Sequence, residues 1–155
     1  MEAVILIGIQ AVGKSSFYQE RFFHTHVRIN LDMLRTRHRE RLLIRACLEA
    51  KQPFVVDNTN VKREERAKYI EAAQAAGFRV VGYYFPSTVR DALRRNNLRT
   101  GPRHIPVKGV LGTYKRLQEP SLDEGFDLLY RVRIDAANRF VVTQWPRAPI
   151  HSRAG

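Results

Sequence analysis

The stretch Gly8-Ile9-Gln10-Ala11-Val12-Gly13-Lys14-Ser15 decides the fold of this chain. It matches the pattern G-x-x-x-x-G-K-[ST], in which the backbone N–H groups of a loop surround a phosphate group. Residues 4–7 form a short apolar run typical of a buried strand, and residues 15–23 predict a helix. A loop between such a strand and helix lies at the positive end of the helix dipole. The stretch therefore predicts a phosphate-binding loop for a nucleoside triphosphate.

The individual loop residues have different expected parts in binding. Gly13 lets the backbone approach the phosphates, Lys14 reaches the β- and γ-phosphates, and the Ser15 hydroxyl ligates Mg²⁺. ATP and Mg²⁺ are thus the expected cofactors. Ala11 stands where we would expect a second glycine, which makes the loop stiffer than a glycine-richer one. The other predicted cofactor-binding positions are Gly8, Gln10, Ala11, Val12 and Ser16.

Length and charge limit the classes of protein that fit. The 155 residues suggest one domain, residues 1–145, and the two prolines in residues 146–155 indicate a disordered C-terminal tail. A net charge of +12 favours a polyanionic partner such as nucleic acid, although a basic, solvated surface is the alternative. No apolar run approaches the roughly 20 residues that span a bilayer. The lone Cys47, expected to be buried, and the lack of a signal peptide predict a cytoplasmic protein.

Strands alternate with helices along the rest of the chain. This order predicts an α/β fold of the P-loop NTPase/kinase type, with a parallel central sheet covered by helices on both faces. Ligands of such sheets bind beyond the carboxyl ends of the strands. The residues after Gly8, Asn30, Asp57 and Phe85 should therefore surround one crevice. We predict strands at 27–30, 54–57, 78–85, 128–134 and 139–143, and helices at 31–50, 62–76, 88–98 and 107–117.

Asp32 is the best candidate for a catalytic base. It follows the second predicted strand, so it should face the crevice, and Arg35 lies three residues further on the same helical face. This pair places a base beside a side chain that can hold an acceptor phosphate through two hydrogen bonds. The alternative for Asp32 is a helix N-cap, where aspartate is favoured.

Asp57 closes the third strand, at the place of the second acidic residue of phosphate-loop proteins. It could hold a water bound to Mg²⁺ or orient Lys14 and Ser15. The residues after it, Asn58, Thr59 and Asn60, are candidates for shaping the acceptor site. Ordinary turn chemistry is their alternative.

An arginine-rich segment follows the fourth strand. Arg95 and Arg99 lie four residues apart on one helical face, and residues 90–104 contain five arginines and one acid. Such a segment above the nucleotide would stabilise charge in the transition state, with a hinge at Gly101-Pro102. The alternative is a solvated basic surface.

Taken together, these motifs resemble the kinase domain of polynucleotide 5′-kinases. The resemblance covers residues 4–145, and its motifs are residues 8–15, 32–35, 57–60, 95–99, 104–106, 114–116, 119–120 and 124–126. It implies that Asp32 is the general base for a 5′-hydroxyl and that Arg35 holds the adjacent phosphate. It also implies that Arg99, with Arg95, contacts the ATP phosphates. The acceptor partners would be 5′-ends of DNA or RNA.

Two other functions fit parts of the same pattern. One is a kinase for a small-molecule alcohol that uses the same base and the same arginines. The other is a nucleotide-gated nucleic-acid-binding ATPase with little kinase activity. The many basic residues favour a polynucleotide over a metabolite, and Asp32 favours an enzyme over a binding switch.

Overall fold

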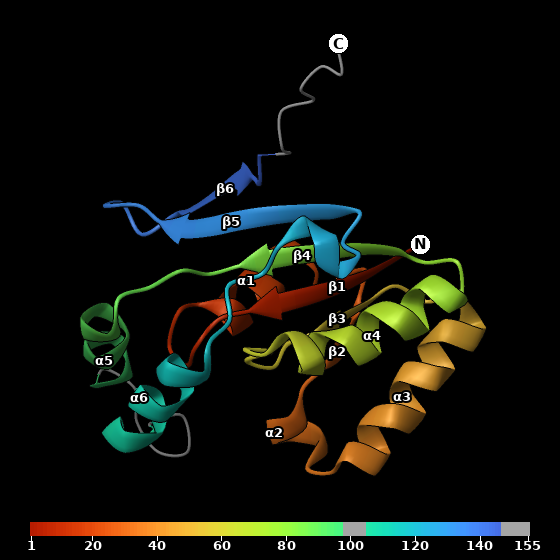
Figure 1. The fold of residues 1–155 in the computed structure, drawn as a ribbon, viewed down its shortest axis with the longest axis horizontal. Coiled ribbons are helices and arrows are strands. Elements are labelled where there is room, and N and C mark those ends of the chain that lie inside the picture. Colours follow the sequence, from red (N-terminus) through yellow and green to blue (C-terminus); the bar gives the residue numbers. More distant parts are fainter. Residues whose placement is uncertain (98–104, 147–155) are drawn as a thin grey trace.

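The computed structural model describes residues 1–97 and 105–146. Its centre is a six-stranded sheet with the order β2-β3-β1-β4-β5-β6 (Figure 1). The first five strands in this order are parallel to one another, and β6 is antiparallel to β5. The strands are β1 (Glu2–Ile7), β2 (Val27–Ile29), β3 (Phe54–Val56), β4 (Arg79–Tyr84), β5 (Leu128–Ile134) and β6 (Phe140–Gln144). The expected, mostly parallel α/β fold is confirmed.

Apolar side chains on both faces of the sheet hold the helices. On β1, Ala3, Ile5 and Ile7 join the core under α3 and α4, whereas Val4 and Leu6 join the core under α1, α5 and α6. This alternation follows from the two-residue period of a strand that is buried on both faces. The helices are α1 (Lys14–Arg21), α2 (Leu31–Leu34), α3 (Arg37–Ala50), α4 (Arg63–Ala75), α5 (Val89–Asn97) and α6 (Val107–Arg116), with a 3₁₀ turn η2 (Leu122–Glu124).

The single helix predicted for residues 31–50 is wrong, because the chain breaks at Arg35. Arg35 has a φ of 75° and ends α2, and α3 begins anew at Arg37. Each helix has its own cap: the side chain of Asn30 accepts from the N–H of Met33, and that of Thr36 accepts from Arg39. Two N-caps six residues apart compete with one continuous helix.

The break also changes which residues of α3 are buried. Leu42 has the spacing of an apolar-face residue in a helix over 31–50 but is 47% exposed, whereas Glu40 is 1% exposed. Cys47 is buried as expected, and burial raises the pKa of its thiol. The face of α3 that packs on the sheet thus carries one acid among apolar side chains.

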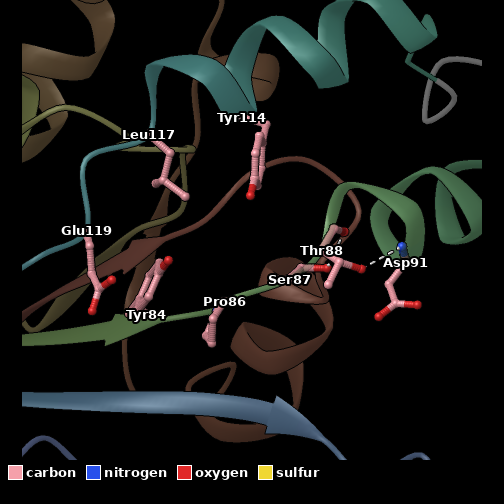
Figure 2. Close-up of a pocket in the computed structure, with 8 residues that line it drawn as sticks. All are labelled: Tyr84, Pro86, Ser87, Thr88, Asp91, Tyr114, Leu117 and Glu119. Carbon is pink, nitrogen blue, oxygen red and sulfur yellow. Dashed lines mark hydrogen bonds between the residues drawn. The ribbon is translucent and has the colours of Figure 1, made fainter.

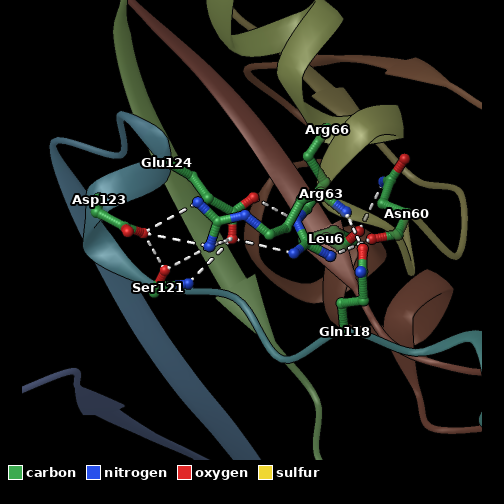
Figure 3. Close-up of polar contacts among 8 residues, drawn as sticks. All are labelled: Leu6, Asn60, Arg63, Arg66, Gln118, Ser121, Asp123 and Glu124. Carbon is green, nitrogen blue, oxygen red and sulfur yellow. Dashed lines mark hydrogen bonds and ion pairs between the residues drawn. The ribbon is translucent and has the colours of Figure 1, made fainter.

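A buried ion pair fixes the loop that follows β3 (Figure 3). The guanidinium of Arg66 is fully buried and donates to both carboxylate oxygens of Glu124, at 2.7 and 3.0 Å. Its remaining nitrogen donates to the carbonyl of Asn60 at 2.8 Å. The backbone N–H of Ser121 also donates to Glu124, at 3.0 Å. This network joins α4, η2 and the end of the β3 loop into one unit.

The strands predicted at residues 128–134 and 139–143 are confirmed and form a hairpin. Residues of β5 and β6 pair in antiparallel register from Tyr130 with Gln144 to Ile134 with Phe140. The carboxylate of Asp135 accepts the N–H groups of Ala137 and Arg139 and closes the turn. Residues 147–155 of the predicted tail lie outside the described part of the chain. None of the described helices is long and apolar enough to cross a membrane.

Candidate phosphate-transfer site

The carboxyl ends of β2, β3, β1 and β4 meet at one edge of the sheet, where α2, α5 and α6 also lie (Figure 1). Backbone hydrogen bonds join these ends directly: Gly8 N–H to the carbonyl of Thr59, Phe85 N–H to Ile7, and Asp57 N–H to Ile29. The side-chain amide of Asn30 donates to the carbonyl of Asp57 at 2.6 Å. The predicted strand ends therefore lie side by side around the phosphate loop.

The phosphate loop has the backbone that a phosphate cradle needs. Gly13 has a φ of 96° and begins α1, and Ala11 also has a positive φ of 64°. No side chain of the described residues caps α1, so the N–H groups of its first turn can bind an anion. Ala11 thus occupies the left-handed conformation at the position where the sequence led us to expect glycine.

Lys14 lies under the loop rather than in solvent. It is 9% exposed, and its ammonium donates to the carbonyls of Gly8 at 2.9 Å and Ile9 at 2.7 Å. Both acceptors belong to the loop itself. The charge of Lys14 is therefore held where the loop closes around a phosphate.

Gly13→Ala should destabilise both the loop and the fold. A methyl group at a φ of 96° is strained, and it would lie 3.3 Å from Ile134 and Phe140. We expect a loss of about 1–2 kcal/mol in the free energy of unfolding, from the left-handed backbone alone. ADP binding, measured by calorimetry, should weaken as well.

The matched control is Gly112→Ala in α6. The added methyl group would meet only Arg116, at an ordinary 3.5 Å. Because alanine is the better helix former, this variant should gain up to about 1 kcal/mol. Equal melting temperatures for the two variants would contradict the proposed strain at Gly13.

Ser15 and Asp57 are brought together as expected. The hydroxyl of Ser15 donates to the buried carboxylate of Asp57 at 3.0 Å. Arg28 of β2 completes a triad: its Nε donates to Asp57 at 2.9 Å, and its Nη2 donates to Ser15 at 3.0 Å. Hydroxyl and carboxylate oxygens are the protein ligands that Mg²⁺ prefers, so the pair fits that ion.

The protein offers Mg²⁺ only a partial shell. Within residues 1–97 and 105–146, no three His, Cys, Asp or Glu side chains gather to hold a metal. Mg²⁺ commonly takes one or two protein oxygens and completes its shell with water and phosphates. Ser15 and Asp57 therefore suit a magnesium–nucleotide complex rather than a resident metal ion.

Asp32 and Arg35 lie exposed at the same edge of the sheet. Asn30, not Asp32, caps α2, so the N-cap alternative for Asp32 is wrong. Asp32 and Arg35 are both exposed, and the side chain of neither makes a hydrogen bond or ion pair with another described residue, although the backbone N–H of Arg35 donates to the carbonyl of Leu31. Their expected shared helical face does not exist, because α2 ends at Leu34. They instead occupy a four-residue helix and the residue that terminates it.

A buried polar network holds α2 in place. The side chain of Asn58 accepts from the N–H of Leu31 at 2.9 Å and donates to Glu40 at 3.1 Å. Glu40 also accepts from the hydroxyl of Tyr69 and from Arg37, both at 3.0 Å. Burial and the Glu40 charge raise the pKa of Tyr69, so its hydroxyl stays a donor. The network fixes the start of the short helix that carries Asp32.

The other predicted site residues lie in different environments. The amide of Asn60 is buried and donates to the carbonyl of Leu6 at 2.7 Å, which favours turn chemistry over contact with an acceptor. Thr59 is half-buried, and its carbonyl holds Gly8. Gln10 donates to the hydroxyl of Thr113 in α6 at 2.9 Å. Ser16 is exposed on α1.

The arginine segment is described only in part. Arg95 is half-buried in α5, and Arg99 lies outside the described residues. The buried Asn96 accepts from the N–H of Ile105 at 2.9 Å and donates to its carbonyl. Asn96 thus joins α5 to the chain just before α6.

Two parts of the site escaped sequence reasoning. Arg28 was missed because a short strand containing one arginine looks like an edge strand with a solvated side chain. The network of Asn58, Glu40 and Tyr69 was missed because it joins a loop and two helices. The one feature of the sequence that could have indicated a role for Arg28 is its position. It lies one residue before the buried Ile29, near the carboxyl end of a strand.

Comparison with known proteins agrees with this fold. A family model described as AAA domain (AAA_33) matches residues 37–120, which begin after the phosphate loop. The bifunctional polynucleotide phosphatase/kinase of Schizosaccharomyces pombe is 28% identical over 133 residues. That match covers 81% of this chain but 32% of the relative, so the chain spans about a third of the relative's length.

Solved structures share the fold at low identity. A gluconokinase from Sinorhizobium meliloti 1021 has a TM-score of 0.59 and 20% identity, covering 84% of this chain and 82% of that one. Chaetomium thermophilum Kti12 in complex with ADP-AlF3 has a TM-score of 0.64 and 15% identity, covering 88% and 92%. These similarities establish the fold, and the fold alone does not choose an acceptor.

Proposed function

The chain belongs to the AAA domain family, as a nucleotide-binding P-loop domain of the kinase-like type, and on this premise we propose that it transfers the γ-phosphate of ATP to 5′-hydroxyl ends of DNA or RNA. One observation carries the proposal. Asp32 is an exposed carboxylate without a described protein partner, held at the phosphate-loop edge by a buried network, and Arg35 lies three residues away. A base beside an anion-binding arginine is what a phosphorylated alcohol acceptor requires.

The donor side uses the phosphate loop. Lys14 and the N–H groups at the start of α1 offset the charge of the β- and γ-phosphates. Ser15 and Asp57 would hold Mg²⁺, which neutralises charge on the same phosphates when bound. Arg28 positions both of these side chains. Arg95 and Arg99 would stabilise the charge that develops during transfer.

The acceptor side uses α2 and α3. Asp32 accepts the proton of the 5′-hydroxyl as it attacks, and Arg35 holds the phosphate next to that terminus. The exposed arginines of α3, among them Arg39 and Arg45, extend the positive surface beyond Arg35. The identity to a polynucleotide phosphatase/kinase supports this acceptor class. A kinase for a small-molecule alcohol is the second candidate, since the fold is shared with a gluconokinase.

Salt and acceptor length separate these two candidates. We expect KM to fall as a 5′-hydroxyl oligonucleotide is lengthened, because more of its phosphates meet arginines. For single strands, the logarithm of the affinity should fall by about 0.7 per neutralised phosphate for each unit of log salt. Arg45→Ala should flatten this slope for long acceptors only. The measurement is KM at several salt concentrations and saturating ATP.

Arg133→Ala is the control with the same change of charge. Arg133 is exposed on β5. In the sheet, β1 and β4 separate β5 from β2 and β3, the two strands that α3 connects. This variant should leave the slope unchanged. A KM that is independent of both length and salt would exclude the polynucleotide acceptor and leave the small-molecule kinase.

A further inference from the structure

A pocket of about 620 Å³ lies beside the phosphate loop, between the end of β4, the start of α5 and the end of α6 (Figure 2). Its volume is in the range of small-molecule sites. It adjoins the loop through α6, because Thr113 binds Gln10 and the next residue, Tyr114, lines the pocket. The lining residues are Tyr84, Pro86, Ser87, Thr88, Asp91, Tyr114, Leu117 and Glu119.

Tyr84 is a buried polar side chain without a partner in the described structure. The residue as a whole is 7% exposed, no hydrogen bond between described residues involves its hydroxyl, and that oxygen is not among the fully buried unpaired atoms, so it opens onto the pocket. Figure 2 shows the ring of Tyr84 directed from β4 into the pocket, toward the side on which Tyr114 and Leu117 lie. Burial raises the pKa of Tyr84, so the hydroxyl stays protonated and can donate. A hydroxyl that faces the pocket and has no protein partner among the described residues is available to hydrogen-bond a ligand there.

The charge of the pocket is opposite to that of the protein. The chain has a net charge of +12, yet the described residues that line the pocket include the carboxylates of Asp91 and Glu119 and no arginine or lysine. Each carboxylate has only a long ion pair, with Arg94 and Arg131 respectively, both at 3.6 Å. These acids repel phosphate groups but can accept hydrogen bonds from amino groups.

The Tyr84 wall of the pocket lies on the acceptor side of the sheet, although the other walls come from α5 and α6, which pack on the core of the opposite face. Tyr84 belongs to the core under α3 and α4, whereas Gly13 of the phosphate loop faces Ile134 and Phe140. Phe140 packs against the core of the opposite face. A ligand that hydrogen-bonds to Tyr84 is therefore on the side of α2 and α3, where the proposed acceptor would bind; Leu34 of α2 packs against the same core as Tyr84.

We propose that this pocket takes an unpaired nucleobase with an exocyclic amino group from the acceptor strand. This inference rests on the proposed function. The base would stack on the exposed ring of Tyr114, as bases of single strands stack on aromatic side chains. Its amino group would donate to Asp91 or Glu119, and Tyr84 would donate to a carbonyl or ring nitrogen of the base. Cytosine fits this pattern, whereas uracil has no amino group to offer.

Fluorescence of the single tryptophan provides a direct test. The ring of Trp145 lies 6.1 Å from that of Tyr84, so an occupied pocket should change its emission. We would titrate the full chain, saturated with ADP and Mg²⁺, with cytidine and with uridine. Cytidine should bind with an affinity roughly tenfold or more above that of uridine, because this is the discrimination that one good hydrogen-bonded contact to a base edge usually gives.

Tyr84→Phe removes only the hydroxyl and should weaken cytidine severalfold. Tyr83→Phe is the matched control. Tyr83 is the neighbouring residue on β4 and packs against the core of the opposite face, so removing its hydroxyl should leave cytidine binding unchanged. Equal binding of cytidine and uridine would overturn the proposal. Cytidine that binds the nucleotide-free chain but not the ADP-saturated chain would do so too, as would binding of spermidine in place of cytidine.

Transfer assays separate this inference from the proposed function. Oligonucleotides of one length that begin with cytosine or uracil should differ in KM, and Tyr84→Phe should remove the difference. If no oligonucleotide is phosphorylated while cytidine binds as expected, the proposed kinase activity is excluded and the proposed base-binding pocket is supported. If transfer occurs but cytidine does not bind, the proposed base-binding pocket is excluded and the proposed kinase activity is supported.

Discussion

Lys14→Ala is expected to abolish phosphate transfer, with a fall in kcat on the order of 10³-fold, as when a preorganised charge on a transition state is removed. The buried ammonium of Lys14 binds the carbonyls of Gly8 and Ile9, inside the loop that would hold the phosphates. The measurement is transfer of label from γ-labelled ATP to 5′-hydroxyl oligonucleotides, with ADP binding followed in parallel.

A loss of activity alone would not separate catalysis from folding. Lys14→Ala also removes two buried hydrogen bonds, each worth about 1 kcal/mol, and leaves two carbonyls without that donor. Lys14→Met keeps most of the buried stem without the charge and serves as the second variant. Both should lose transfer while thermal melting shows a folded protein. Transfer at a near-wild-type rate in either folded variant would exclude the proposed role of the loop.

The parts of the site that lie close together in the sequence were predictable. The phosphate loop, with the strand before it and the helix after it, is a local pattern whose geometry follows from backbone chemistry. The meeting of Ser15 with Asp57 followed from topology, because parallel strands that end at one edge bring their last residues together. Even the positive φ of Ala11 had a signal, the absence of an expected glycine.

The parts that depend on contacts across the fold were not predictable. A helix from Leu31 to Ala50 has good apolar spacing, and only the competition between two N-caps breaks it at Arg35. Glu40 lies in a charged stretch typical of an exposed helix, yet it is buried, because Tyr69 and Asn58 of other elements donate hydrogen bonds to its carboxylate. Such polar burial depends on partners that no local pattern identifies.

The same break in the helix makes the role of Asp32 testable. With Asn30 as the cap, the carboxylate of Asp32 contributes nothing to the hydrogen bonds that begin α2. Removing its charge should therefore leave stability almost unchanged. Removing the cap instead, by Asn30→Ala, should cost about 1 kcal/mol, because the N–H of Met33 and the carbonyl of Asp57 both lose a partner.

Asp32→Asn should lower kcat on the order of 10²-fold or more, because the amide keeps the shape of the side chain but cannot accept the proton of the acceptor hydroxyl. KM for the oligonucleotide should change little, since Arg35 still holds the adjacent phosphate. Glu71→Gln, which neutralises an exposed acid on α4, is the control and should leave kcat unchanged. The measurement is the split between kcat and KM, with melting curves for each variant. A rise in KM at constant kcat would make Asp32 a binding residue, and an unchanged rate would place the base elsewhere.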